Sequence, residues 1–350
     1  MLAIFSVTFP FFALVAAGYL AARTRLLPLE AIPGLNLFLL YFALPCMLFR
    51  FGANTPIAQL LDGTVALVWC LAALGAVGLT VWLSRRGLRA LNWNDTAFGA
   101  LVAAFPNTGF MGVPLLVALL GPMAAGPIIL TMLIDMVLTS SLCLALSRLD
   151  EHDGTGGHAA LAAARKALRG AVMNPLAWSI GLGALASALQ FKPWAPLDRT
   201  IAMLGDAASP AALFTIGAVL ARSTLLAKAV SSGAGAHAAA SASASATVDP
   251  TEARPGRWVG LHSVLPVVVV KLAVHPLLVA GLGWAAMRMG LPLSPAAYGV
   301  LVLAAALPSA SNVSMLAERF GADNGRIARI ILWTTVATFF SYPLMVGWVA

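Results

Sequence analysis

Two short stretches of this sequence place amide and hydroxyl side chains beside proline and glycine, within otherwise apolar runs. The first break, Pro106 to Pro114, has the sequence PNTGFMGVP, and the second break, Pro308 to Asn312, has the sequence PSASN. Proline removes a backbone donor and glycine adds backbone freedom, so a helix is expected to open at both places. Asn, Ser and Thr side chains there can bind a ligand or replace the lost backbone bonds.

An opened helix suits a particular kind of ligand. Its free N–H groups and the positive end of its dipole favour an anion such as a carboxylate. We therefore predict one substrate-binding site built from both breaks, because matched interruptions of apolar runs are typical of transporter binding sites. Its candidate residues are Pro106, Asn107, Thr108, Gly109, Pro308, Ser309, Ser311 and Asn312. The alternative is that these side chains only repair the broken helices.

A second set of candidates consists of ionisable residues inside apolar runs, where each costs at least about 2.5–3.5 kcal/mol at the membrane centre. They are Asp135, Asp206, and the pair Lys271 and His275, which are one helical turn apart. An acid or a histidine can accept a coupling proton, and a lysine can neutralise an anion or the carboxyl end of a half-helix. The alternative is that Lys271 pairs with an acid and only fixes the packing.

Other polar and aromatic residues favour structural roles. A charged cluster is expected to set topology at a membrane boundary, with gating as the alternative; it comprises Glu318, Arg319, Asp323, Arg326 and Arg329. Most tryptophans are predicted to form an interfacial belt without a ligand site; this group is Trp69, Trp82, Trp93, Trp194, Trp258, Trp284 and Trp348.

The composition excludes a soluble domain. Of 350 residues, 60% are hydrophobic and only 10% are charged, against about 25% in a typical soluble domain. The formal net charge of +8 does not indicate nucleic-acid binding, because the basic residues lie between apolar segments. The sequence contains no HExxH or GxSxG motif and no metal-ligand spacing, so we expect no enzyme, metal or cofactor.

Apolar runs of spanning length predict an all-α polytopic membrane protein with ten transmembrane helices. The predicted ranges are 2–22, 31–51, 64–84, 96–120, 123–147, 171–190, 199–221, 259–287, 295–319 and 326–349. We divide them into a first five-helix unit, 1–147, a cytoplasmic loop, 148–170, and a second five-helix unit, 171–350. The Ala/Ser/Gly-rich segment 223–257 is predicted to be a flexible cytoplasmic linker within the second unit.

The two units resemble each other. The second run contains ALPCMLF at 43–49, the seventh contains ASPAALF at 208–214, and the fourth and ninth runs contain the breaks. Because five is odd, the second unit enters the membrane from the opposite side, so the pattern predicts two inverted repeats whose broken helices cross. Most Lys and Arg residues outside the runs then fall in loops on one side, which predicts that both termini face outward.

The motifs at the breaks resemble those of the auxin efflux carrier family, including its bacterial members of the malonate-transporter type. The resemblance rests on FPNTGFMGVPLL from Phe105 and LPSASNVSMLAERFGAD from Leu307. Supporting segments are LLYFALPCMLF from Leu39, SPAALFTIG from Ser209 and KLAVHPLL from Lys271. By position, the family motif carries over to Pro106, Asn107, Gly109, Pro308, Ser309 and Asn312.

Membership implies ten spans in two inverted repeats, with the substrate site where the broken helices cross. It also implies a carrier of organic anions, such as mono- or dicarboxylates, that hydrolyses no ATP. The expected localisation is a bacterial inner membrane. The expected partners are a small anion and membrane lipids, with no nucleic acid, and a homodimer stays open. The coupling ion stays open between H⁺ and Na⁺. The alternatives are an anion uniporter or channel, or a transporter-like anion sensor without coupled flux.

Overall fold

The described part of the chain is almost entirely helical. The computed structural model describes residues 2–55, 62–86, 91–150, 165, 175–231 and 261–349. Its helical elements in chain order are α1 (Leu2–Arg23), η1 (Leu29–Ala31), α2 (Ile32–Phe38), η2 (Leu39–Ala43), α3 (Leu44–Asn54), α5 (Gly63–Arg86), α6 (Trp93–Ala104), η3 (Thr108–Gly112), α7 (Val113–Leu120), η4 (Pro122–Ala124), α8 (Ala125–Ile134), η5 (Asp135–Thr139), α9 (Ser140–Leu146), α11 (Pro175–Ala188), α12 (Ala195–Ser231), α14 (Leu261–Val269), η8 (Val270–Val274), α15 (His275–Arg288), α16 (Pro295–Ala305), α17 (Asn312–Arg319) and α18 (Asn324–Val349).

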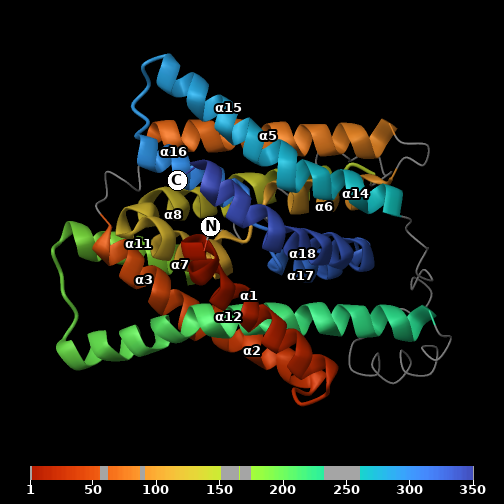
Figure 1. Ribbon diagram of the computed structural model, residues 1–350, viewed down its shortest axis with the longest axis horizontal. Helices are drawn as coiled ribbons and strands as arrows, with labels where there is room; N and C mark the ends of the chain where they lie inside the picture. Colours follow the sequence, from red (N-terminus) through yellow and green to blue (C-terminus); the bar gives the residue numbers. More distant parts are fainter. Residues whose placement is uncertain are drawn as a thin grey trace.

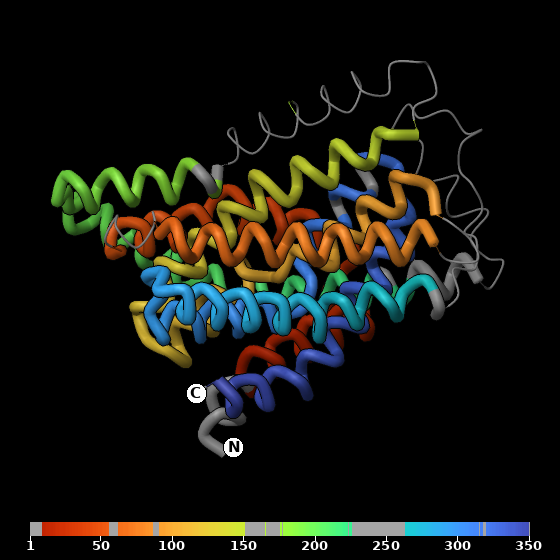
Figure 2. The backbone as a smooth tube through the Cα atoms, turned by 90° about the horizontal axis from the view of Figure 1, so that it is seen from above, coloured from red at the N-terminus to blue at the C-terminus, as the bar shows by residue number. Residues whose placement is uncertain are grey.

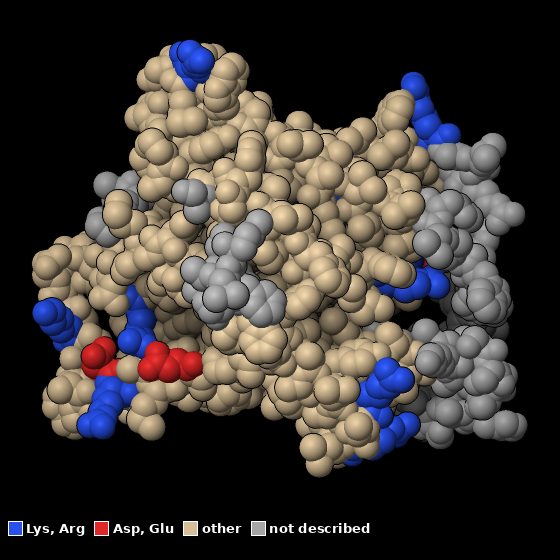
Figure 3. Space-filling model, viewed as in Figure 1, with Lys and Arg blue, Asp and Glu red and all other residues tan. Residues whose placement is uncertain are grey.

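Six of the described helical segments are long and apolar enough to cross a membrane. They are Leu29–Asn54, Gly63–Arg86, Pro122–Leu146, Ala195–Arg222, Ser263–Arg288 and Asn324–Val349. Shorter apolar helices lie at Phe9–Arg23, Thr108–Leu120, Trp178–Ala188 and Pro295–Ala305. On the face drawn in Figure 3, charged side chains lie toward the two ends of the molecule and an uncharged band separates them. The protein is therefore an all-helical, multi-span membrane protein.

The two predicted polar connections are only partly described. Most of the loop 148–170 lies outside the described residues, as does 232–257 of the predicted linker. The linker prediction was wrong at its start, because α12 continues as a helix to Ser231. The segment Leu225 to Val230 supplies Leu, Ala and Lys, which are good helix formers and propagate the helix beyond the apolar span.

Helix α1 crosses α12 at very short distance, as the red and green helices in Figure 1 show. A Cβ atom built on Gly18 would lie 1.8 Å from the carbonyl oxygen of Phe214, and one on Gly217 would lie 1.9 Å from that of Val15. No side chain larger than hydrogen fits between these backbones. The crossing therefore depends on glycine in both helices, as in the small-residue contacts of other membrane helix pairs.

Helix α3 crosses α11 in a corresponding way. A Cβ on Gly183 would lie 2.3 Å from the carbonyl oxygen of Phe49, and one on Gly52 would lie 2.8 Å from that of Ile180. These contacts repeat those between α1 and α12 with one constant offset, since 183 − 18 and 217 − 52 are both 165. The two crossings thus use backbone positions that are related by one sequence offset.

The remaining helices pack around α6 and α16. Residues Thr96–Ala104 of α6 and 299–305 of α16 are buried without a polar face, which is typical of helices enclosed on all sides. Helix α5 packs against α6 and lies beside α15, and α14 packs against α18. Figure 2 shows α5 and the α14 to α15 segment running roughly parallel across the molecule. Both enclosed helices end inside this bundle, where the two breaks begin.

Several helices widen into a five-residue π-helical segment. In three cases, η2, η3 and η8, a proline follows at the first or second position of the next α-helix: Pro45, Pro114 and Pro276. A proline ring in a regular helix clashes with the carbonyl of residue i−4, and the wider turn moves that carbonyl aside. The fourth segment, η5, instead begins at Asp135. π-Helical turns often occur at functional sites, and three of these, η3, η5 and η8, contain candidate residues from the sequence analysis.

Candidate functional site

The two breaks meet in the middle of the bundle through their backbones. The N–H of Asn107 donates to the carbonyl of Pro308 at 2.8 Å, and the N–H of Ala310 donates to the carbonyl of Phe105 at 3.0 Å. Between these bonds, Pro106 and Ser309 form an isolated antiparallel bridge. Proline is tolerated there because this position in the bridge donates no hydrogen bond. We call residues 105–107 and 308–310 the crossing.

Ser309 satisfies backbone groups at the crossing. Its hydroxyl donates to the carbonyl of Val102 at 2.8 Å, in the last turn of α6, and its N–H donates to the hydroxyl of Thr334 at 3.3 Å. A carbonyl at the end of a buried helix has no intrahelical partner and must find one elsewhere. For Ser309, the repair of a broken helix is therefore a role that the structure shows directly.

Asn107 differs from Ser309 because only its backbone is engaged. With φ −78° and ψ 56° it forms an inverse γ-turn, in which the N–H of Thr108 donates to the carbonyl of Pro106 at 2.8 Å. Its carbonyl accepts from Met111 and Gly112, which starts η3. Within the described residues its side-chain amide has no hydrogen-bond partner, although the residue is 3% exposed. The Asn107 amide is thus available to a ligand.

Two further polar atoms at the breaks lack partners. The hydroxyl of Thr108 and the side-chain oxygen of Asn312 are both buried without a hydrogen bond in the described structure. Buried polar groups without partners are rare and call for an explanation such as an absent ligand or water. Gly109 has ordinary space around it, since a Cβ there would lie 3.5 Å from the sulfur of Met132.

Ser311 lies in the wall of a partly open pocket beside the second break. The pocket is small and lies between α12, α17 and α18. Its lining is mostly aliphatic and consists of Ile216, Val219, Leu220, Ser311, Ser314, Ala328 and Ile331. The structure therefore brings all eight predicted binding residues to the crossing or its immediate continuation, and Ser311 also lines this adjoining pocket.

A polar cluster lies next to the crossing and contains Asp135 of η5. The indole N–H of Trp69 and the hydroxyl of Thr139 donate to the same oxygen of Asp135, Oδ1, at 3.1 and 3.0 Å. The other oxygen, Oδ2, is buried without a partner. The backbone N–H of Ser140 donates to the carbonyl of Asp135 in the π-helical turn, and the hydroxyl of Ser140 donates to the same carbonyl at 2.9 Å.

Lys271 and His275 complete the polar cluster. The ammonium of Lys271 donates to the carbonyl of Ala305 at 2.9 Å and lies 3.4 Å from Nδ1 of His275. The His275 ring stands 5.3 Å from the Trp69 ring, and its Nε2 is buried without a partner. All four side chains, Asp135, Trp69, Lys271 and His275, are fully buried. Because Ala305 ends α16, Lys271 neutralises the carboxyl end of a half-helix at the second break.

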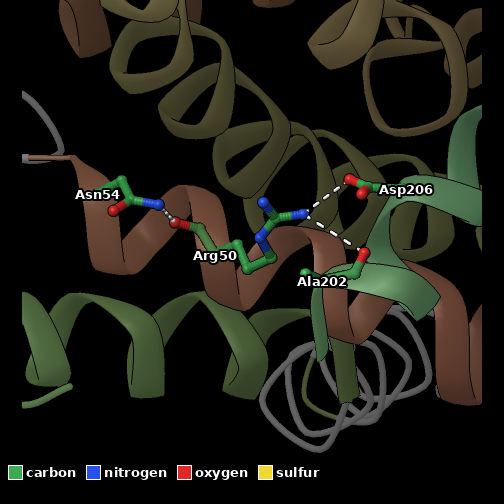
Figure 4. Close-up of polar contacts among 4 residues, drawn as sticks. All are labelled: Arg50, Asn54, Ala202 and Asp206. Atoms are coloured by element: carbon green, nitrogen blue, oxygen red, sulfur yellow. Dashed lines mark hydrogen bonds and ion pairs between the residues drawn. The ribbon is translucent and has the colours of Figure 1, made fainter. Parts of the chain in front are cut away.

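No described acid lies within ion-pair distance of Lys271. An ion pair that the structure does show joins Arg50 to Asp206 at 2.7 Å (Figure 4). The structure thus places Asp206 apart from the other candidates, because its side chain is 75% exposed and Arg50 also donates to the carbonyl of Ala202. Exposed pairs of this kind contribute little to stability. In the part of the chain that the structure describes, the alternative in which Lys271 pairs with an acid finds no direct ion pair.

Arg326 departs from the expectation that it sets topology at a membrane boundary as part of a charged cluster. It is 1% exposed, and its guanidinium donates to the carbonyls of Asp95 and Ser263, at 2.9 and 3.2 Å. Gly99 leaves the space for it, since a Cβ there would lie 2.8 Å from the guanidinium. Arg326 therefore joins α6, α14 and α18. The sequence held one signal of this packing: Gly99 lies inside a helix, where no turn requires a glycine, so a close neighbour is expected.

Trp69 also departs from its prediction, since it lies fully buried in the polar cluster and not in an interfacial belt. Its position inside the predicted run 64–84 was a signal, because a belt residue is expected at a run's end. Sequence analysis also missed Ala305. Its backbone carbonyl accepts the hydrogen bond of Lys271, and any residue type at this position would offer the same carbonyl.

Comparison with known proteins identifies the family of this chain. The family model described as "Membrane transport protein" matches residues 3–346, almost the whole chain. This chain belongs to that family. It is the auxin efflux carrier family that the motifs at the breaks predicted, and its members are transporters and not enzymes.

Individual relatives are more distant. The chain is 29% identical over 335 residues to a protein of Rhizobium meliloti (strain 1021) named "Putative malonate transporter", covering 93% of this chain and 90% of the relative. It is 24% identical over 337 residues to an "Uncharacterized transporter" of Methanothermobacter thermautotrophicus, covering 95% and 93%. A stretch of 117 residues is 32% identical to "Auxin efflux carrier component 3a" of Oryza sativa subsp. japonica, covering 32% and 18%.

Proposed function

We propose that this membrane transport protein is a secondary active transporter that moves small organic anions by alternating access. The observation that carries the proposal is the backbone bridge between Pro106 and Ser309, which joins the two breaks at one place. Around it lie the unpaired amide of Asn107 and the unpaired buried oxygens of Thr108 and Asn312. Opened backbone at membrane depth is tolerated where it lines a binding cavity.

The architecture we propose is ten spans in two inverted five-helix repeats. The described parts of all ten predicted ranges contain helix, six of them in long apolar helices. The glycine contacts of α1 with α12 and of α3 with α11 support the repeat, because each uses the backbone positions of the other shifted by one offset. In such proteins one bundle rocks against the other around the fixed site.

For the substrate we propose mono- or dicarboxylates of malonate-like size. An amide donor beside opened helix ends suits a carboxylate. The name of the Rhizobium meliloti relative points to the same class. We place the protein in a bacterial inner membrane with both termini on the periplasmic side, because the Lys and Arg residues concentrate in the loops of the opposite side.

Transport by purified protein in liposomes tests the proposal. Vesicles preloaded with malonate, succinate or acetate should take up the same labelled anion by counterflow, and Asn107→Ala should lower the rate. The Asp206→Asn variant is the matched control, since its exposed side chain lies apart from the crossing. No counterflow of any carboxylate would contradict the proposal. Binding without flux would indicate a sensor, and single-channel conductance in a planar bilayer would indicate a channel.

A further inference from the structure

We infer that Asp135 is the proton-binding site of this carrier, and that its proton strengthens anion binding at the crossing through the charge of Lys271. The inference rests on the proposed transport of anions and specifies its coupling ion. Asp135 lies in η5, Lys271 lies in η8, and Trp69 and His275 bridge them through the hydrogen bond to Asp135 and the ring contact described above.

The geometry of Asp135 allows a proton to bind without rebuilding the cluster. Both donors, Trp69 and Thr139, use Oδ1, so they keep their hydrogen bonds whether or not the carboxyl is protonated. Oδ2 is buried with no partner in the described structure, which leaves it free to receive the proton. A buried carboxylate that accepts two hydrogen bonds at one oxygen and none at the other is unusual, because a permanently charged carboxylate normally accepts hydrogen bonds at both oxygens.

The charge of Lys271 is balanced at a distance. The ammonium of Lys271 donates to the neutral carbonyl of Ala305 and lies next to the imidazole of His275. It is too far from the carboxylate of Asp135 for a direct ion pair. The two residues still attract each other electrostatically. The other titratable groups described near Asp135 are the thiols of Cys70 in α5 and Cys143 in α9. Asp135 is thus the carboxylate that offsets Lys271.

Protonation of Asp135 removes this compensation. The cluster then carries the uncompensated ammonium of Lys271, held on Ala305 just before Pro308 and the crossing. A carboxylate bound at the crossing restores neutrality. By linkage, each ligand must raise the affinity of the other by the same factor, so anion and proton bind and cross together. The sign is fixed: a lower pH tightens anion binding.

A sodium ion fits this cluster poorly. Hard cations are held by several oxygen ligands, whereas the side chains described around Asp135 are an indole N–H, an ammonium, an imidazole and a single hydroxyl, that of Thr139, which already donates to Oδ1. Among the described residues no group of three His, Cys, Asp or Glu side chains could hold a metal ion. The chemistry of this site therefore selects a proton.

Infrared spectroscopy tests the proton site without any substrate. In wild-type protein in liposomes, titrated from about pH 8 to pH 5, a carbonyl band of a protonated carboxyl should appear. The band should be absent in Asp135→Asn and retained in Asp206→Asn. Absence of the band in wild type, or its persistence in Asp135→Asn, overturns the inference. Should Asp135→Asn fail to fold, Trp69→Phe replaces it as the test. Trp69→Phe should shift the band by removing one hydrogen-bond donor, and an unshifted band would overturn the inference.

Transport of labelled malonate tests the coupling. In wild type, an imposed pH gradient should drive malonate to accumulate on the side to which protons flow. The apparent Kd for malonate should rise by up to about tenfold for each unit of increase in pH. Asp135→Asn, which imitates the protonated state, should lose both the accumulation and the pH dependence. Lys271→Gln should weaken binding at low pH. If wild type performs counterflow that no pH gradient drives, the coupling is wrong while the transporter stands. If malonate shows no counterflow, the infrared titration alone decides the proton site.

Discussion

The hydroxyl of Ser309 donates a hydrogen bond to the carbonyl of Val102, although the two residues are separated by 207 positions in the chain. The second break thus supplies the partner that the last turn of α6 lacks. Lys271 likewise supplies a hydrogen-bond donor to the carbonyl of Ala305, in the last turn of α16. Each half-helix that ends in the bundle is satisfied by a residue from another segment, so the crossing forms only when the helices pack together.

Asn107→Ala should weaken anion binding and leave folding intact. Its side-chain amide has no partner in the described structure, so truncation leaves nothing buried unsatisfied. A hydrogen bond to a charged ligand contributes about 1.5–3 kcal/mol, which corresponds to a loss of roughly tenfold to a hundredfold in Kd. Binding isotherms and thermal unfolding of the apo protein check this. Asn54→Ala is the control, since Asn54 is exposed and bonds only the carbonyl of Arg50. An equal loss of folded protein in Asn107→Ala would favour a repair role.

Ser309→Ala should destabilise the fold even without substrate. It leaves the buried carbonyl of Val102 without its partner, at a cost of about 1–3 kcal/mol. Thr24→Ala removes a similar side-chain bond, from Thr24 to the carbonyl of Leu20, but in an exposed place, and should change stability little. Unfolding in mixed micelles compares the two. A Ser309→Ala variant as stable as Thr24→Ala would show that water replaces the hydroxyl.

Gly18→Ala and Gly183→Ala should damage the protein in the same way. Each adds a methyl group where a backbone carbonyl oxygen lies within 2.3 Å, so the helices must separate. Overpacking costs typically 1–3 kcal/mol and more where backbone is the obstacle. Gly78→Ala, with nothing within 4 Å of its Cβ, is the control and should be neutral or slightly stabilising. Yield of folded protein and thermal unfolding measure the effect. Opposite results for the two crossings would argue against the repeat.

Gly99→Ala should displace Arg326 and loosen the join of α6, α14 and α18. The added Cβ would lie 2.8 Å from the guanidinium, which donates to the carbonyls of Asp95 and Ser263. Each carbonyl left unpaired costs about 1–3 kcal/mol. Arg288→Met is a control for loss of a charge, because Arg288 stacks on Trp284 at the end of α15. Proteolysis near residues 320–326 should speed up in Gly99→Ala alone.

Much of the fold could be predicted because its causes are local. Apolar runs of spanning length gave the helices, and proline with glycine gave the two breaks, since both effects depend on a few neighbouring residues. The nearness of Lys271 and His275 also followed from their spacing of four residues.

Trp69 and Arg326 show what spacing leaves out. Both are large residues of types that commonly lie at membrane interfaces, and both are buried against polar partners far along the chain. Their burial depends on which helices become neighbours, and neither type of residue reveals that by itself. Asp206 is the opposite case, since its exposed partner Arg50 removes it from the buried candidates.

The amino-acid sequence alone determined that this protein is a multi-span membrane transporter of the auxin efflux carrier family with two interrupted helices, because hydrophobicity and backbone chemistry act residue by residue. The tertiary structure decided what the interruptions are for. Only packing placed Pro106 against Ser309, left the Asn107 amide unpaired, and set Asp135 and Lys271 on either side of Trp69 and His275. Those relationships depend on distances between helices, which no local pattern encodes.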